Sequence, residues 1–356
     1  MNYKLRSLFA FALTLSALGF STARAQTNLD LPDASQKAVV KQRLGITDIK
    51  ITYHRPLVNG RKVWGALVPF GQVWRAGANE NTTIEFSAPV SVEGKPLPAG
   101  TYGLHMIPTA DSWTIIFSKM AVAWGSYTYS ETEDALRVTV KPRENEMEEA
   151  LEYEFEDLKL DSVMVTMKWE KLAVPFRVSV TDAETTIPHI RNQLRGRAQY
   201  SWETLNEAAN YCATKKINLE EALKWVDQSI KIEERFENLA TKADLLKASN
   251  KPDEAKKIRD HALEIATSTA LYSYARTLQS EKRDAEAMEI FPVVVKRFPQ
   301  ELVGHLAQAR LKSAAGDFPG AIEAVKKAQA LATSDQQKTA LQGLITKLEA
   351  KQDINK

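Results

Sequence analysis

The segment from Tyr53 to Phe86 carries the densest group of side chains suited to binding a ligand. Within 34 residues it holds three arginines, two tryptophans, a histidine and four glycines. Guanidinium groups bind carboxylate or phosphate through two parallel hydrogen bonds, and indole faces suit flat groups such as sugars. The sequence therefore predicts a groove for a small anionic or sugar-like ligand. The predicted ligand-binding residues are His54, Arg55, Arg61, Trp64, Trp74, Arg75, Asn79, Glu80 and His105.

The same residues also allow a purely structural interpretation. Tryptophans in a β domain often fill its core, and arginines often pair with acids such as Glu80 or Glu85. Both interpretations stay open at this point. His54 and His105 alone do not define a metal site, because a zinc site needs at least one further placed ligand. No metal and no cofactor are predicted.

Signatures of common enzyme classes are missing from the sequence. It contains no phosphate-binding glycine loop, no HExxH, no GxSxG and no CxxC. One enzymatic alternative is a carbohydrate-active hydrolase, in which paired carboxylates would act beside Trp64 or Trp74. Glu80 with Glu85 or Asp111 would be that pair. Carboxylates are common in any sequence, so this pair is weak evidence for catalysis. We therefore expect an exported binding or assembly protein rather than an enzyme.

The first 25 residues have the pattern of a cleaved export signal. Lys4 and Arg6 precede an uncharged apolar run at residues 8–20, and Ala23-Arg24-Ala25 supplies a cleavage site before Gln26. No later stretch has the roughly 20 apolar residues that a membrane span needs. The sequence therefore predicts a periplasmic or extracellular protein without a membrane span.

Charge argues against a nucleic-acid partner. The formal net charge is +2, but residues 26–356 sit near −1 because three basic residues lie in the leader. Residues 26–180 carry 17 basic and 20 acidic groups, and residues 181–356 carry 27 and 25. Neither half has the basic surface of a nucleic-acid binder. The single cysteine, Cys212, excludes an intramolecular disulfide and is expected to be a small buried side chain.

Two different periods divide the chain. Residues 26–180 contain short runs rich in β-branched and aromatic residues, separated by Gly and Pro turns, which predicts an antiparallel β-sandwich or jelly-roll-like domain. Residues 181–199 form a linker or docking segment, with a short helix expected from Pro188 to Gln199. Residues 200–351 have the apolar pattern of helices. The predicted fold class is thus α+β multidomain.

The helical part repeats itself. Ala222, Ala255, Ala287 and Ala321 occupy equivalent places at spacings of 33, 32 and 34 residues, which is the period of a two-helix unit. This pattern resembles the tetratricopeptide repeat, in about four copies over residues 200–332, with a capping helix at Asp335–Lys351. The resemblance implies a protein or peptide partner.

Residues 39–180 also resemble a known family. The matching motifs include Tyr53-His54-Arg55-Pro56, Gly60-Arg61-Lys62-Val63-Trp64-Gly65, Trp74-Arg75-Ala76-Gly77-Ala78-Asn79-Glu80, Leu97-Pro98-Ala99-Gly100-Thr101-Tyr102 and Trp124-Gly125. They are similar to an uncharacterised exported bacterial family, the domain of unknown function 2911. Trp124, from the last motif, joins the predicted ligand-binding residues. The resemblance implies a fold and an export context, and no activity.

Overall fold

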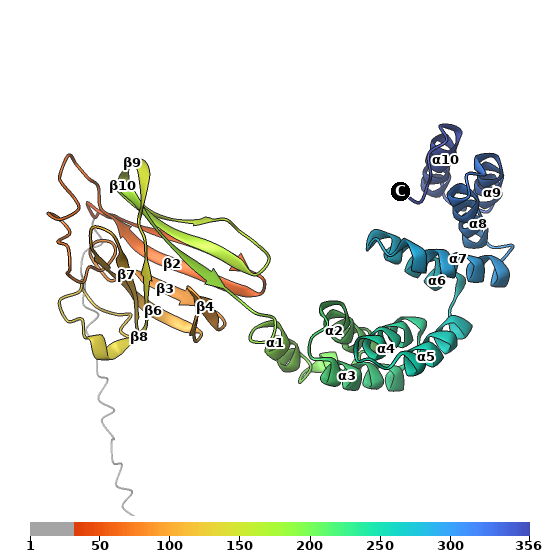
Figure 1. The fold of residues 1–356 in the computed structure, drawn as a ribbon, viewed down its shortest axis with the longest axis horizontal. Coiled ribbons are helices and arrows are strands. Elements are labelled where there is room, and N and C mark those ends of the chain that lie inside the picture. Colours follow the sequence, from red (N-terminus) through yellow and green to blue (C-terminus); the bar gives the residue numbers. More distant parts are fainter. Residues whose placement is uncertain (1–31) are drawn as a thin grey trace, which may run out of the picture.

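The structure is a computed structural model that describes residues 32–356, so the predicted signal peptide lies outside the described residues. An antiparallel β part is followed by a helical part (Figure 1). Within residues 32–356, no helix is long and apolar enough to cross a membrane. The predicted fold class is confirmed.

The larger sheet of the β part has six strands in the order β1-β2-β3-β6-β7-β8. Every neighbouring pair is antiparallel. The strands are β1 Gln36–Leu44, β2 Thr47–Arg55, β3 Thr83–Phe86, β6 Gly100–Pro108, β7 Trp113–Ser118 and β8 Asp134–Val140.

The smaller sheet has four strands in the order β5-β4-β10-β9. They are β4 Val90–Val92, β5 Lys95–Leu97, β9 Arg143–Glu156 and β10 Ser162–Ser179. Strand β10 continues without a break through its 18 residues. The pairing of β10 with β9 shifts register on either side of Glu170, which has a left-handed φ of 55°. Such bulges bend a long strand without ending it.

The core lies between one face of each sheet. Along β2, Ile49, Ile51 and Tyr53 point inward, and alternation therefore turns Thr52 and His54 to the opposite face. Tyr153 of β9 joins the two sheets, because its N–H donates to the Tyr53 hydroxyl at 3.2 Å. The other face of the six-stranded sheet is thereby left free to carry polar side chains.

The helical part follows a short connection. Helix α1 spans Thr186–Gln193, and a 3₁₀ turn covers Arg197–Tyr200, so the expected Pro188–Gln199 helix is interrupted. Ile187 of α1 is buried in a cluster with Leu205 and Trp225. Arg191 of α1 forms an ion pair with Glu221, in which its Nε and Nη2 donate to the carboxylate at 2.8–3.0 Å. Helix α1 therefore packs on the first helices of the repeat.

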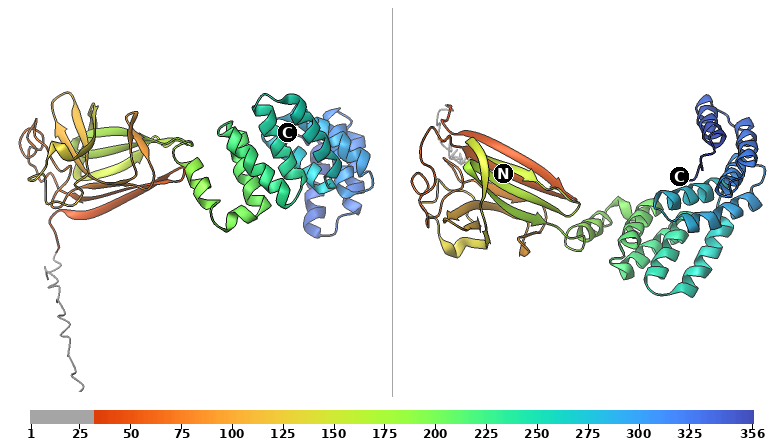
Figure 2. Two further views of the ribbon diagram at one scale, coloured as in Figure 1. Left: turned by 90° about the horizontal axis from the view of Figure 1, so that it is seen from below. Right: turned by 45° about the horizontal axis from the view of Figure 1, so that its top comes forward.

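The remaining helices stack pair by pair (Figure 2). The alanines that gave the period, Ala222, Ala255, Ala287 and Ala321, are all buried, which lets paired helices approach closely. Cys212 is buried as expected. The helices are α2 Trp202–Lys215, α3 Leu219–Ile232, α4 Phe236–Ala248, α5 Pro252–Ile265, α6 Ser268–Ser280, α7 Asp284–Arg297, α8 Leu302–Ala314, α9 Phe318–Ala330 and α10 Asp335–Glu349.

Candidate functional sites

Of the predicted aromatic residues, Trp64 lies in the core of the β part and the half-buried Trp74 packs against that core. The Trp64 ring packs edge-on against Trp113 at 4.9 Å and against Trp169 at 5.6 Å between ring centroids. The Trp74 ring stacks on Trp169 at 5.8 Å, and its Nε1 donates to the Gly77 carbonyl at 3.1 Å. Both indoles thus follow the core alternative that the sequence left open.

Arg55 and Arg61 bind main-chain carbonyl groups. Arg55 Nε donates to the Leu151 carbonyl at 2.9 Å, and its Nη2 contacts Glu152 at 3.2 Å. Arg61 Nε donates to the Val58 carbonyl at 3.0 Å. Arg55 therefore ties β2 to β9, and Arg61 closes its own loop. In these positions both guanidinium groups support the fold.

Three polar side chains follow one row across the outer face of the six-stranded sheet. Thr52, Thr83 and Gly103 are paired across β2, β3 and β6. His54 and His105 lie two residues after Thr52 and Gly103, and Asn81 lies two residues before Thr83, so alternation puts the three side chains on the same face. All three are buried, with 6%, 7% and 3% of their surface exposed.

Residues 119–130, the covering segment, bury this row. Its Ala123 carbonyl accepts from the Asn81 N–H at 3.0 Å, and the main chains of Trp124 and Glu80 form an isolated antiparallel β-bridge. Ser126 Oγ lies 2.9 Å from His105 Nδ1. Close approach needs small residues: a Cβ on Gly103 would lie 2.4 Å from the Met120 carbonyl oxygen. The row is thus enclosed between the sheet and the covering segment.

Burial in this enclosed row favours the neutral form of an ionisable side chain. Burial lowers the pKa of His105 to about 4, against the weaker opposing effect of Asp134, so the imidazole is neutral near pH 7. His54 Nε2 lies 3.3 Å from Glu80, whose side chain is largely exposed. The His54–Glu80 pair therefore forms the edge of the enclosed row.

Two buried polar atoms beside the covering segment lack a hydrogen-bond partner within the described part of the chain: Arg75 Nε and Asn81 Oδ1. Arg75 Nη1 would lie 2.5 Å from a Cβ placed on Gly125, so its guanidinium group lies directly against the covering segment. An unpaired buried donor or acceptor costs about 1–3 kcal/mol, which a ligand that supplied the partner would recover.

The structure thus brings together some of the predicted residues and separates the others. Arg75, Glu80 and His105 contact the covering segment, which itself carries the exposed Trp124, and His54 pairs with Glu80. Asn79 has a left-handed φ of 56°, and its Nδ2 donates to the Ser35 carbonyl. The sequence missed Asn81 and Ser126, although the alternation of β2, β3 and β6 could have indicated Asn81. Within residues 32–356, no group of three or more His, Cys, Asp or Glu side chains is placed to hold a metal ion.

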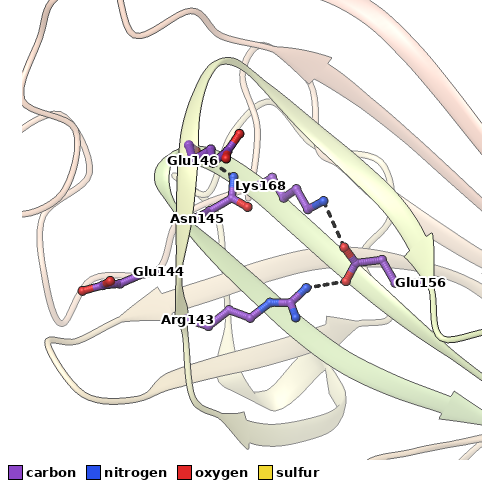
Figure 3. A pocket seen from close by; sticks show the side chains of 6 residues that line it. All are labelled: Arg143, Glu144, Asn145, Glu146, Glu156 and Lys168. Atoms are coloured by element: carbon purple, nitrogen blue, oxygen red, sulfur yellow. Dashed lines mark hydrogen bonds and ion pairs between the residues drawn. The ribbon is translucent and has the colours of Figure 1, made fainter.

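A surface hollow on the β9–β10 ribbon is already occupied by its own ion pairs (Figure 3). Arg143 donates to Glu156 at 2.5 Å, and Lys168 contacts Glu154 at 2.7 Å and Glu156 at 2.9 Å. These hydrogen bonds to Lys168 lower the pKa of Glu154. The side chains that line the hollow therefore form a row of ion pairs that stabilises the β9–β10 ribbon.

The carboxylates of the hydrolase alternative are spread over the β part. Glu80 contacts His54, Glu85 pairs with Lys50, and Asp111 is exposed in the turn between β6 and β7. Trp64 and Trp74 are packed against other indoles. Nothing in this arrangement supports the hydrolase alternative.

A different site lies on the helical part, on the facing sides of α6 and α8. Its polar side chains are Tyr272, Arg276, Gln279, Arg310 and Ser313, and together they form what we call the α6–α8 groove. Residues 352–356, the tail segment, follow α10, and residues 353–355 of this segment contact the groove side chains. Figure 1 shows the C mark on the inner side of the curve made by α6, α8 and α10.

The chain is therefore an antiparallel β domain followed by paired helices. Residues 35–178 match the family model described as "Protein of unknown function (DUF2911)", which confirms the resemblance seen in the sequence. No curated protein matches the chain. A solved structure titled "Crystal structure of YrrB: a TPR protein with an unusual peptide-binding site" is similar at 14% identity and a TM-score of 0.24. The match covers 46% of this chain and 88% of that one.

Proposed function

We propose that the protein is an exported binding or assembly protein whose helical repeat takes a protein segment in the α6–α8 groove. One observation carries this proposal: a short segment of the chain, residues 353–355, already contacts the groove. Arg310 Nη1 donates to the Ile354 carbonyl at 2.5 Å, and Ser313 Oγ accepts from the Ile354 N–H at 3.0 Å. Hydrogen bonds from groove side chains to the main chain of a bound segment contribute to peptide recognition.

Selection from a random peptide library tests this proposal. Peptides would be selected on the chain with and without residues 351–356 and then measured against two charge-reversal variants. Arg276→Glu changes the groove, whereas Lys296→Glu changes an exposed position of α7. We expect Arg276→Glu to weaken the selected peptides at least tenfold, because it places a carboxylate where they bind. Peptides that tolerate both variants equally, or no selected peptides at all, would contradict the proposal.

The β domain offers a second candidate function, binding of a small anionic or sugar-like compound beneath the covering segment. The unpaired, buried Arg75 Nε and Asn81 Oδ1 favour it, because they offer a donor and an acceptor to a ligand. The exposed Trp124 indole could stack on such a compound at the edge. A thermal-shift screen of anionic compounds and sugars tests this function. Any hit should be lost in Arg75→Lys, whose single ammonium group cannot make the forked contact.

The location stays a proposal as well. The pattern at residues 1–25 supports export with cleavage after Ala25, into the periplasm or the extracellular space. Mass spectrometry of the exported protein should find Gln26 at its N-terminus. Retention of Met1 in the exported product would contradict cleavage.

A further inference from the structure

The tail segment reaches the α6–α8 groove through a reversal of the chain. After α10, Lys351 adopts a left-handed φ of 55°. The N–H groups of Lys351 and Gln352 donate to the carbonyls of Leu348 and Lys347, both at 2.9 Å. This arrangement of bonds is the Schellman type of helix end, which turns the chain back along the helix. The tail segment is thereby directed toward α8.

Ile354 is the apolar anchor of the tail segment. Only 5% of its surface is exposed, and it belongs to the apolar cluster of Leu306, Ala309 and Leu341. Its N–H and carbonyl are both bonded to side chains of α8, as described above. Both polar main-chain groups of Ile354 are therefore satisfied by the groove. Ile354 lies within a turn that the Lys356 N–H closes by donating to the Asp353 carbonyl at 3.4 Å.

The two flanking residues are recognised through their side chains. Asp353 Oδ1 accepts from Ser313 Oγ at 2.8 Å. Asn355 Nδ2 donates to the Arg310 carbonyl at 3.0 Å, and Asn355 Oδ1 accepts from Gln279 Nε2 at 2.9 Å. The groove thus contacts an acid, an aliphatic side chain and an amide in sequence.

The groove carries an excess of positive charge. Over residues 32–356, Arg276 and Arg310 form no ion pair with a carboxylate within 4.0 Å. Burial, and then repulsion from the charge of Arg310, lower the pKa of Arg276. A ligand with carboxylates near the anchor would relieve this repulsion.

We propose that the α6–α8 groove selects partner segments with an acidic residue, then an aliphatic anchor, then an amide side chain, and that Asp353-Ile354-Asn355 occupies it in cis as a competitor. This inference rests on the proposed function of the groove and adds its sequence preference and its regulation. A partner must displace the tail segment before it can bind. The tail segment therefore competes with partner segments for the α6–α8 groove of its own chain.

Tethering makes this competition effective even when the tail segment binds weakly. A short tether presents its ligand at an effective concentration on the order of millimolar. A competing peptide then binds more weakly. The factor is one plus a ratio, in which the effective concentration is divided by the dissociation constant of the tail segment. For a dissociation constant of about 0.1 mM, the full chain binds a partner roughly tenfold more weakly than a chain without the tail segment.

The test uses the tail sequence as a free peptide. A fluorescein-labelled peptide of sequence KQDINK would be titrated by anisotropy into the full chain and into a chain that ends at Ala350. We expect at least tenfold tighter binding to the shortened chain. Replacing the isoleucine of the peptide with alanine should weaken binding at least tenfold, and Ser313→Ala in the shortened chain should weaken it several-fold. Ser273→Ala, at an exposed serine of α6, is the matched control and should have no effect.

Shortening the chain exposes the apolar cluster and could unfold the last helices. The full-length variant Ile354→Ala keeps α10 and its turn while weakening the anchor, and it should also bind the free peptide more tightly than the unchanged chain. A folded shortened chain that binds KQDINK no better than a scrambled NKDQIK peptide would overturn the inference. Equal binding to the full and shortened chains would overturn the competition. Library peptides that still map to the groove would leave the proposed function intact in either case.

Discussion

Replacing Arg75 and Arg55 separately by methionine distinguishes a ligand-facing arginine from a structural one. Arg75 Nε is buried without a partner, and within residues 32–356 its guanidinium group forms no ion pair. Methionine keeps most of the apolar stem and removes the unpaired donor. We therefore expect Arg75→Met to leave the free energy of unfolding within about 0.5 kcal/mol, or to raise it by about 1 kcal/mol.

Arg55→Met is the matched control in the same domain. Arg55 donates to the Leu151 and Ala150 carbonyls at 2.9 and 3.3 Å and pairs with Glu152 at 3.2 Å. Bonds from a charged donor contribute about 1.5–3 kcal/mol when buried. The Arg55 side chain is 35% exposed, which reduces this contribution to roughly 2 kcal/mol.

Thermal melting followed by tryptophan fluorescence measures both variants, because five of the seven tryptophans lie in the β domain. A loss of 2 kcal/mol lowers the midpoint by about 4–8 °C in a domain of this size. We expect that shift for Arg55→Met and almost none for Arg75→Met. A loss of 3 kcal/mol or more in Arg75→Met would refute the reasoning and show that Arg75 holds a structural network.

Four further predictions concern other parts of the chain. The folded pKa of His105, about 4, lies below its unfolded value near 6.5, so its contribution to stability is present above pH 6.5 and lost as the pH falls toward 4. In urea denaturation, the free energy of unfolding of the unchanged chain should therefore fall by roughly 2 kcal/mol between about pH 7.5 and pH 5 through this group. His105→Gln should abolish this decrease. Burial, then Glu154 and Glu148, raise the pKa of Glu152 to about 7, so stability falls as the pH rises from about 4.5 to 7. Glu152→Gln should then stabilise the β domain at pH 8 by roughly 1 kcal/mol and have little effect at pH 4.5. Lys351→Gly should stabilise the helical part by about 0.5–1 kcal/mol in a circular dichroism melt, because glycine adopts the left-handed turn without strain. A chain of residues 26–180 should fold alone with a β-type circular dichroism spectrum, and an unfolded product would show that the two parts share a core.

The architecture was predictable because it depends on periodic features. The spacing of Ala222, Ala255, Ala287 and Ala321 indicated paired helices, and β-branched runs between turns indicated antiparallel strands. The bulge at Glu170 could not be predicted, because it depends on the pairing of β10 with β9 and leaves no local turn signal.

The sites were less predictable because they depend on long-range contacts. Arg55, Arg61 and Arg75 have the same side chain, yet two bind carbonyls and one lies unpaired beneath the covering segment. Nothing local in the sequence separates them. The Asp353-Ile354 segment was also missed, since its role comes from the turn at Lys351 that returns it to α8.

A crystal structure of the chain ending at Ala350, with a library-selected peptide bound, tests the central claim most directly. We predict a peptide that lies between α6 and α8, with an aliphatic side chain in the place of Ile354. Arg310 Nη1 should donate to a peptide carbonyl, and Ser313 Oγ should accept from a peptide N–H, as they do with the tail segment. A peptide bound elsewhere on the repeat, with the α6–α8 groove empty, would contradict the account.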